Sequence, residues 1–134
     1  MSSPAEAMNL ASRKYSAYGP MLKKAIATVL TGGVKEHRFA PSRRVIRTVV
    51  GRQGDEFIDP ERPYCSCSDF FFRVMNGKAE LCYHLLSYRI ATEQGRVDVV
   101  TLDDEEYGQF FTMMVKDVFG ILDRSGGASS LRLP

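Results

Sequence analysis

Cys65-Ser66-Cys67, fourteen further residues and then Cys82-Tyr83-His84 form the stretch that decides how this chain folds. It uses all three cysteines of the chain and one of its two histidines. Three thiols and one imidazole are the ligand set of a closed Cys3His zinc site, in which protein atoms fill all four metal positions. An odd number of cysteines also argues against a disulfide framework. The sequence therefore predicts one structural Zn²⁺, bound by Cys65, Cys67, Cys82 and His84.

Two other interpretations of these cysteines fit the pattern less well. Free cysteines are often small buried hydrophobic residues, but that would scatter them along an apolar face instead of grouping them in two close pairs. A thiol-redox role fits Cys-x-Cys, whereas the accompanying Cys-x-His favours metal ligation. An extended Cys-x-Cys places both thiols on one side of a strand. Cys82 and His84 would point about 200° apart in a regular helix, so Cys82 must precede the helix or lie in its first turn.

The chain before this stretch predicts two helices and a hairpin. Ser3-Pro4-Ala5-Glu6 has the pattern of an N-cap, a first-turn proline and a capping-box glutamate, and this helix should end before Gly19-Pro20. A second helix is predicted over residues 20–30, stopped by Gly32-Gly33. Strand-like segments follow at residues 34–39, 45–50 and 57–58, with residues 51–54 as a turn.

Residues after the hairpin predict further short elements. Pro60 and Pro63 restrict the next segment to a loop or sheet edge until the Cys-x-Cys. Ser68-Asp69 can cap a short aromatic helix over residues 70–75. A helix beside the zinc is predicted over residues 81–94 and ends at Gly95.

The last third of the chain predicts a strand-like link and an amphipathic helix. The link spans residues 97–102, and the four carboxylates of residues 103–106 follow it. They favour a helix N-terminus over a site for a hard cation, because acidic side chains stabilise the positive end of a helix. The apolar stripe that follows is expected to pack in the chain's own core, the alternative being a groove of another chain. Its members are Tyr107, Phe110, Phe111, Met114, Val118, Ile121 and Leu122.

These patterns together predict an α+β fold. It has N-terminal helices, a small antiparallel β-hairpin or sheet carrying Cys-x-Cys, a zinc-proximal helix carrying Cys-x-His, and a C-terminal amphipathic helix. We divide the chain into a helical segment (1–33), a zinc-binding ββα module (34–96), the amphipathic helix (97–124) and a disordered tail (125–134). At 134 residues these parts are expected to form one compact domain.

Composition and motifs favour a non-enzymatic intracellular protein. No apolar run reaches the roughly 20 residues of a membrane helix, and no signal-peptide pattern follows the start. Zinc-binding thiols fit a reducing compartment, cytoplasmic or, in a eukaryote, nuclear. Thr31-Gly32-Gly33 is not followed by Gly-Lys-Ser/Thr, so it is not a phosphate-binding loop. No nucleophile–base pair stands at catalytic spacing, and His37 is predicted to be a surface strand residue.

Charge is unevenly distributed along the chain. Residues 1–52 hold ten Lys/Arg and two Glu (+8), and residues 53–134 hold eight Lys/Arg and fourteen Asp/Glu (−6), which returns the net +2. Basic residues concentrated in the predicted hairpin are candidates for phosphate contacts, although a solvated hairpin has the same pattern. These candidates are Lys35, Arg38, Arg43, Arg44, Arg47 and Arg52.

Three consecutive phenylalanines follow the Cys-x-Cys. Phe70, Phe71 and Phe72 span about 200° of helical arc, so they cannot all face one core. Most of the aromatic residues here should pack around the zinc, but at least one ring should emerge or meet a partner.

The stretch resembles the SWIM zinc finger, whose pattern is Cys-x-Cys, a spacer and Cys-x-His. More narrowly, residues 64–75 and the run Leu81-Cys82-Tyr83-His84-Leu85-Leu86 resemble the SWIM subunit of the Shu complex, over residues 64–91 or roughly a fifth of the chain. One departure is Tyr83, where that family often carries a basic residue.

The resemblance implies an adaptor that pairs with a RecA-family recombinase paralogue in homologous recombination and DNA repair, the partner supplying ATP and most DNA contacts. A small archaeal-type homologue would fit the size. The alternative is a stand-alone zinc-stabilised protein that binds single-stranded or duplex DNA directly through the basic hairpin at residues 35–52.

Overall fold

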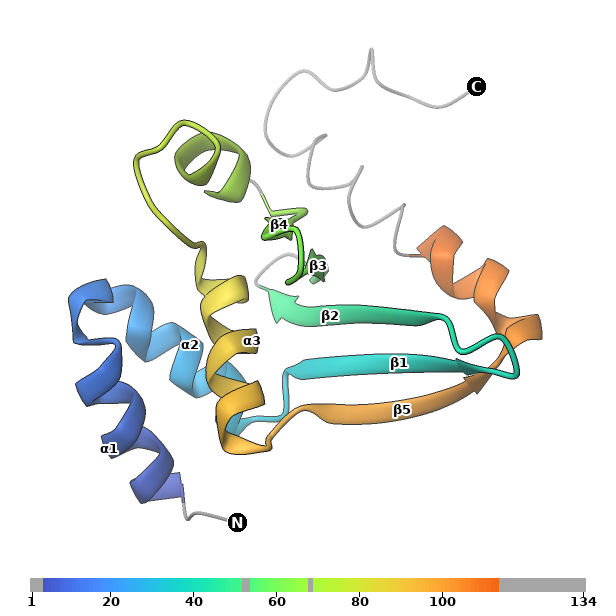
Figure 1. The fold of residues 1–134 in the computed structure, drawn as a ribbon, viewed down its shortest axis with the longest axis horizontal. Coiled ribbons are helices and arrows are strands. Elements are labelled where there is room, and N and C mark those ends of the chain that lie inside the picture. Colours follow the sequence, from blue (N-terminus) through green and yellow to red (C-terminus); the bar gives the residue numbers. More distant parts are fainter. Residues whose placement is uncertain (1–3, 52–53, 68, 114–134) are drawn as a thin grey trace.

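The computed structural model describes residues 4–51, 54–67 and 69–113, which form a β-sheet with helices packed on it (Figure 1). This arrangement confirms the predicted α+β class. In chain order the elements are α1 (Pro4–Lys14), the 3-10 turn η1 (Ser16–Tyr18), α2 (Pro20–Leu30), β1 (Val34–Ala40), β2 (Val45–Gly51), β3 (Gly54–Asp59), β4 (Tyr64–Cys65), the π-helical turn η2 (Phe70–Val74), α3 (Tyr83–Gln94), β5 (Asp98–Asp103) and the 3-10 turn η3 (Asp104–Glu106). Residues 107–113 continue from η3 as a helix.

The sheet is larger than the predicted hairpin. In the described part of the chain it has five strands in the order β4-β3-β2-β1-β5. Strands β1 to β4 form an antiparallel meander, and β5 pairs in parallel with β1, beginning at Lys35 opposite Asp98. A parallel neighbour needs a crossover, and the segment between β1 and β5 that includes α3 supplies it (Figure 1). The predicted link at residues 97–102 is therefore a full member of the sheet.

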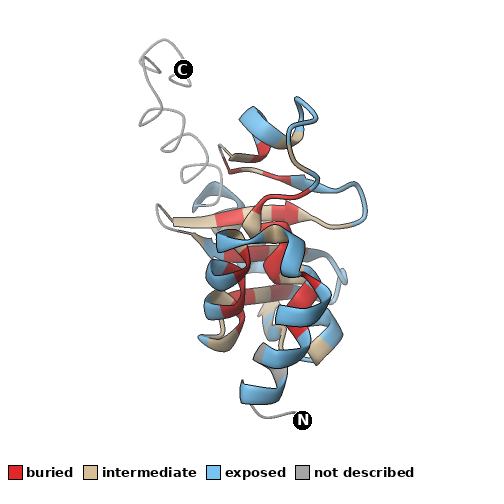
Figure 2. Cartoon of the chain, turned by 90° about the vertical axis from the view of Figure 1, so that its left-hand side faces the viewer, coloured by how far each residue is buried: buried red, intermediate tan, exposed pale blue. Residues whose placement is uncertain are grey.

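Helices α2 and α3 cover one face of the sheet and bury the main core. Figure 2 shows the buried residues between the strands and these helices. The core residues alternate along the strands, as expected for a sheet with one covered face, and recur on one side of each helix. They include Leu22, Ala25, Ile26 and Val29 of α2, Val34, Val49 and Ile58 of the sheet, and Leu85, Leu86 and Ile90 of α3.

The opposite face of the sheet carries the helical residues 107–113. The ring of Phe39 lies 5.1 Å from that of Tyr107 and 5.6 Å from that of Phe110, both in edge-on geometry. Packing of the amphipathic stripe within the chain is thus confirmed for these two members, while Phe111 stays largely exposed. Residues 114–134, which hold the rest of the predicted stripe and tail, lie outside the described residues.

The surface position predicted for His37 is wrong. His37 is only 8% exposed, its ring lies 4.4 Å from that of Phe110, and its Nε2 is 3.0 Å from the hydroxyl of Thr48. The sequence alone could not show that a helix some seventy residues later covers this face.

Most of the helices begin or end close to the residues predicted from the sequence. Helix α2 spans the predicted residues, and α3 ends where Gly95 takes a left-handed conformation with φ of 65°. Ser3, the predicted N-cap of α1, lies outside the described residues. Strand β3 is longer than predicted, since Gly54 pairs with Gly51 across the turn. None of the described helices is long and apolar enough to cross a membrane.

The acidic cluster at residues 103–106 stabilises a helix start, as predicted. Asp103 and Glu106 form a reciprocal capping box, in which Glu106 accepts the backbone N–H of Asp103 at 2.9 Å. Asp104 accepts hydrogen bonds from the backbone N–H and the hydroxyl of Ser42, at 2.9 and 2.6 Å. These contacts tie the helix start to the loop between β1 and β2.

Candidate metal centre

The two halves of the Cys-x-Cys/Cys-x-His pattern meet where β4 approaches the start of α3. Cys65 ends β4 and Cys67 lies just beyond it, while Cys82 is the N-cap of α3 and His84 lies in its first turn. One ligand atom from each of the four residues lies within 4.8 Å of the others, and all four residues are buried. Among the described residues, these three cysteines and one histidine form a group that could hold a metal ion.

The extended backbone after β4 directs the thiols of Cys65 and Cys67 to the same side, toward the protein interior. Cys65 is opposite Ile58 of β3, and the backbone N–H of Ser66 donates to the carbonyl of Phe57 at 2.9 Å. The chain therefore stays extended past Cys65, and side chains alternate, so Cys65 and Cys67 face the same side. Cys82 is also extended, with φ −83° and ψ 168°, which confirms that it precedes the helix.

Hydrogen bonds favour the thiolate form of Cys82, whereas the pKa of Cys65 is shifted in the opposite direction. The backbone N–H of Phe70 donates to Sγ of Cys67 at 3.2 Å. The pKa of Cys82 is lowered to about 4, mainly by hydrogen bonds from the thiols of Cys65 and Cys67 and also by the backbone N–H groups of His84 and Leu85. Hydrogen bonding to the other two thiols and burial raise the pKa of Cys65. Deprotonated sulfur is the form that binds metals.

The imidazole of His84 provides an independent test of the metal site. Both ring nitrogens are buried and neither has a hydrogen-bond partner among the described residues. An unsatisfied buried polar group costs about 1–3 kcal/mol. A metal ion bound to one nitrogen removes part of that penalty, so the four residues fit a metal, and four protein donors leave a tetrahedral ion no open position.

The aromatic residues after the Cys-x-Cys divide between core and surface. Residues Phe70–Val74 form a π-helical turn, closed by a hydrogen bond from the N–H of Met75 to the carbonyl of Phe70 at 3.0 Å, where a regular helix was predicted. The ring of Phe70 is buried, 5.4 Å from that of Tyr64. Phe71 and Phe72 are 63% and 58% exposed.

The cap predicted for this turn is only partly described. Ser68 lies outside the described residues. Asp69 makes no capping hydrogen bond and instead binds the guanidinium of Arg73, at 2.5 and 3.1 Å.

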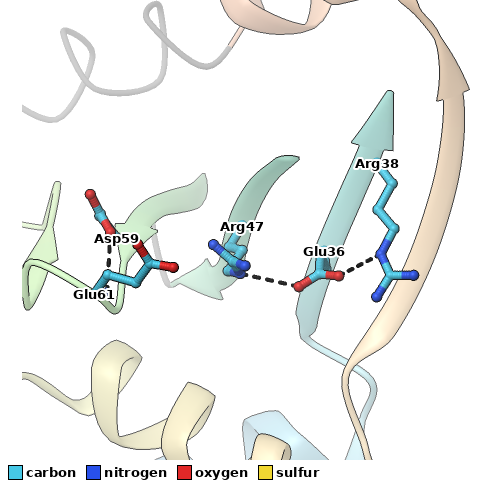
Figure 3. A network of polar contacts seen from close by, with 5 residues as sticks. All are labelled: Glu36, Arg38, Arg47, Asp59 and Glu61. Carbon is cyan, nitrogen blue, oxygen red and sulfur yellow. Dashed lines mark hydrogen bonds and ion pairs between the residues drawn. The ribbon is translucent and has the colours of Figure 1, made fainter. Parts of the chain in front are cut away.

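The buried carboxylate of Glu36 binds the guanidinium groups of two basic hairpin residues, Arg38 and Arg47, as Figure 3 shows. Glu36 is 9% exposed and accepts from Nε of Arg38 at 2.6 Å and from Nε of Arg47 at 3.1 Å. Burial alone would raise the pKa of Glu36, but the two arginines outweigh burial and lower it. The sequence predicted phosphate contacts or solvent exposure for Arg38 and Arg47 and did not predict this network, because no local pattern reveals that Glu36 faces inward.

The other basic candidates are scattered around the hairpin. Arg43 and Arg44 are exposed in the loop between β1 and β2, and the guanidinium of Arg44 lies 4.6 Å from the ring centre of Tyr107. Lys35 is half-buried, and Arg52 lies outside the described residues.

Glu56 was also missed by the sequence analysis. It is 4% exposed on β3 and accepts a hydrogen bond from the hydroxyl of Ser66 at 2.8 Å. Alternation with buried Ile58 would have placed it on the covered face, had the limits of β3 been predicted correctly.

Comparison of the chain with protein-family models, with curated proteins and with solved structures finds no match in any of the three.

Proposed function

We propose that this chain is a non-enzymatic, zinc-stabilised adaptor that pairs with a RecA-family recombinase paralogue to promote homologous recombination and DNA repair. The observation that carries the proposal is the buried Cys3His cluster, whose ligand atoms lie within 4.8 Å of one another. The resemblance of residues 64–91 to the SWIM subunit of the Shu complex supplies the biological context. Zinc-binding thiols would fit a reducing intracellular compartment.

Zinc is the metal that this donor set fits best. Three soft thiolates and an imidazole in a closed tetrahedral site are typical of structural Zn²⁺, while hard cations prefer carboxylate and carbonyl oxygens. The ion would join the end of β4 to the start of α3. Because all four positions belong to the protein, the role is to hold structure and not to activate a substrate.

The exposed rings beside this centre support an adaptor role. Phe71 and Phe72 are displayed at the surface next to Met75, which is 64% exposed, while buried Phe70 anchors the same turn. Aromatic and methionine side chains are enriched in the buried centres of protein interfaces. The metal fixes both ends of the segment that carries them, and this rigidity reduces the entropy lost on binding a partner.

Co-purification tests the adaptor proposal. The zinc-loaded chain is mixed with each recombinase paralogue of its source genome and passed over a size-exclusion column, where one paralogue should co-elute. Replacement of both exposed rings (F71A/F72A) should weaken that complex at least tenfold with the metal content unchanged. Leu10→Ala, which removes an exposed apolar side chain from α1, is the control and should have no effect. Co-elution with no paralogue would contradict the proposal.

Direct DNA binding is the second candidate, favoured by the basic residues on and beside the β1–β2 hairpin. Arg43 is exposed in the hairpin loop, and Arg38 keeps 57% of its side-chain surface exposed despite its bond to Glu36. Binding through such groups should weaken steeply as salt rises. Arg43→Ala should reduce it, whereas Arg62→Ala, a highly exposed arginine of the β3–β4 loop, should not. An adaptor alone would show little DNA binding until its ATPase partner is added.

A further inference from the structure

A cleft of about 450 Å³ lies between the start of α2 and the two segments that follow the candidate metal ligands. Tyr18 and the first turns of α2 form one wall, Asp69 and Arg73 form a second, and Tyr83 of α3 forms the third. Ligand sites in proteins usually have volumes of roughly 300–1,000 Å³. This cleft falls within that range, so it is large enough to receive a side chain of another molecule.

The two cations of the cleft differ in how their charges are compensated. The guanidinium of Arg73 donates to both carboxylate oxygens of Asp69, at 2.5 and 3.1 Å. Lys24 forms no ion pair with any described residue, and its Nζ lies 6.0 Å from the centre of the Tyr83 ring. The cleft therefore presents one positive charge without a counter-charge, next to an aromatic ring.

Apolar surface lies beside this charge. Pro20 and Met21 line the cleft together with Tyr18, whose hydroxyl donates to Glu80 at 3.2 Å. Aromatic rings attract other rings in edge-on or offset geometry, and methionine adapts its shape to them. An occupant that combines an aromatic or large apolar group with a negative charge would match both parts of the cleft.

The cleft adjoins the exposed aromatic surface proposed to contact the partner. Arg73 belongs to the same short turn as Phe71 and Phe72, both of which are exposed. A partner that covers these two rings would thus extend to the cleft.

We propose that the cleft binds an acidic peptide segment of the protein partner, which places an aromatic or large apolar side chain beside Tyr18 and Tyr83 and a carboxylate beside Lys24. The inference rests on the adaptor role of the proposed function and specifies the chemistry of the partner's segment. A singly charged carboxylate matches one uncompensated lysine. A phosphate monoester carries nearly two charges and is commonly bound by the paired donors of arginine, and Arg73 already binds Asp69.

Two blocked dipeptides that differ in one charge test the cleft of the zinc-loaded full chain. Acetyl-Phe-Asp-amide and acetyl-Phe-Asn-amide have nearly the same shape, and each is titrated while the backbone ¹H–¹⁵N shifts are followed. Both should shift the signals of Lys24 and Tyr83. The aspartate dipeptide should bind about two- to fivefold more tightly, as expected for one exposed ion pair. No shift at the cleft with either dipeptide, or equal affinities for the two, would overturn the inference.

A lysine pair on α2 supplies the variant and its control. Lys24→Ala should remove the difference in affinity between the two dipeptides. Lys23→Ala should preserve it, because Lys23 is an exposed neighbour on the same helix that does not line the cleft. Equal effects of the two substitutions would show general attraction between charges and would contradict a site at Lys24.

The outcomes separate this inference from the proposed function. A chain that co-elutes with a recombinase paralogue but binds neither dipeptide would keep the adaptor role and lose the cleft as a docking site. Tighter binding of thymidine monophosphate than of acetyl-Phe-Asp-amide would assign the cleft to a nucleotide and overturn the peptide proposal.

Discussion

Gly51 faces the ring of His84 and the carbonyl of Gly54 so closely that no side chain fits between them. A methyl group there would lie 2.9 Å from each. Such contacts are shorter than packed atoms tolerate, so either the β2–β3 turn or the histidine would have to move. A glycine at the end of β2 thereby constrains His84, a candidate metal ligand more than thirty residues later in the sequence.

Gly51→Ala is predicted to destabilise the fold by about 1–3 kcal/mol and to weaken metal binding. Gly108→Ala is the matched control, because a methyl group at Gly108 meets no atom of the described residues within 4 Å. In the helix of residues 107–113 it should stabilise the protein by up to about 1 kcal/mol. Denaturant titration and chelator competition measure both variants. Equal stability of Gly51→Ala and the parent would contradict the crowding described here.

Single residues differ in how well the sequence predicts them. Cys65, Cys67, Cys82 and His84 could be predicted as a group because ligand spacing is a local property. The partners that surround them could not, since Glu56 and Gly51 reach the site only through the register of β2 and β3. Glu36 is similar: its contact with Arg47 depends on strand pairing and not on sequence neighbours.

The helix of residues 107–113 packs on the sheet against a buried histidine. The His37 ring lies against that of Phe110, its Nδ1 is buried without a hydrogen bond to any described residue, and burial lowers the pKa below the usual 6.5. Nearby Asp55 and Asp98 raise that pKa and Lys35 lowers it, but burial is the largest effect. Protonation therefore opposes the packing of this helix.

Stability is predicted to decrease as pH falls from 8 to 5, in part through His37. Because its pKa is lower in the native state, the unfolded chain takes up the proton first as pH falls through about 6.5, and this favours unfolding. The loss is about 1.4 kcal/mol per unit by which the pKa is lowered. His37→Gln should show a smaller decrease in denaturant titrations, with metal loss in acid common to both proteins. Identical pH profiles would contradict the assignment.

Elements with clear end signals could be predicted, and long-range pairings could not. Pro20 and the Gly32-Gly33 pair delimit α2, and Gly95 ends α3. The run at residues 97–102 is apolar enough for a strand, but nothing local indicates that it pairs in parallel with β1. The π-helical form of Phe70–Val74 was also not predictable, because an aromatic run has no period that separates it from an α-helical turn.

At the scale of the whole molecule, the candidate metal centre lies where the sheet edge meets the helical layer. Cys65 and Cys67 extend from the edge strand β4, and Cys82 and His84 begin the helix that covers the core. Apparent binding energies of structural zinc sites, about 10–16 kcal/mol, are as large as the total stability of most small domains. The metal should therefore decide whether this part of the chain folds.

Removal of the metal is predicted to unfold the protein around the centre. A strong chelator should lower the melting temperature of the zinc-loaded chain, and excess Zn²⁺ should restore it. Cys65→Ser should behave like the chelated protein even with zinc present. Circular dichroism and elemental analysis measure the two effects. A Cys65→Ser protein that keeps one equivalent of zinc and its melting temperature would show that Cys65 is not a ligand.

The place of β5 also matters while the chain is being synthesised. Strand β1 has β2 on one side and β5 on the other, yet β5 is made about sixty residues later. Until residue 103 leaves the ribosome, one side of β1 presents unpaired backbone groups, which are a template for pairing with another chain. A nascent polypeptide stalled before residue 98 is thus open to self-association, and completion of the sheet ends that exposure.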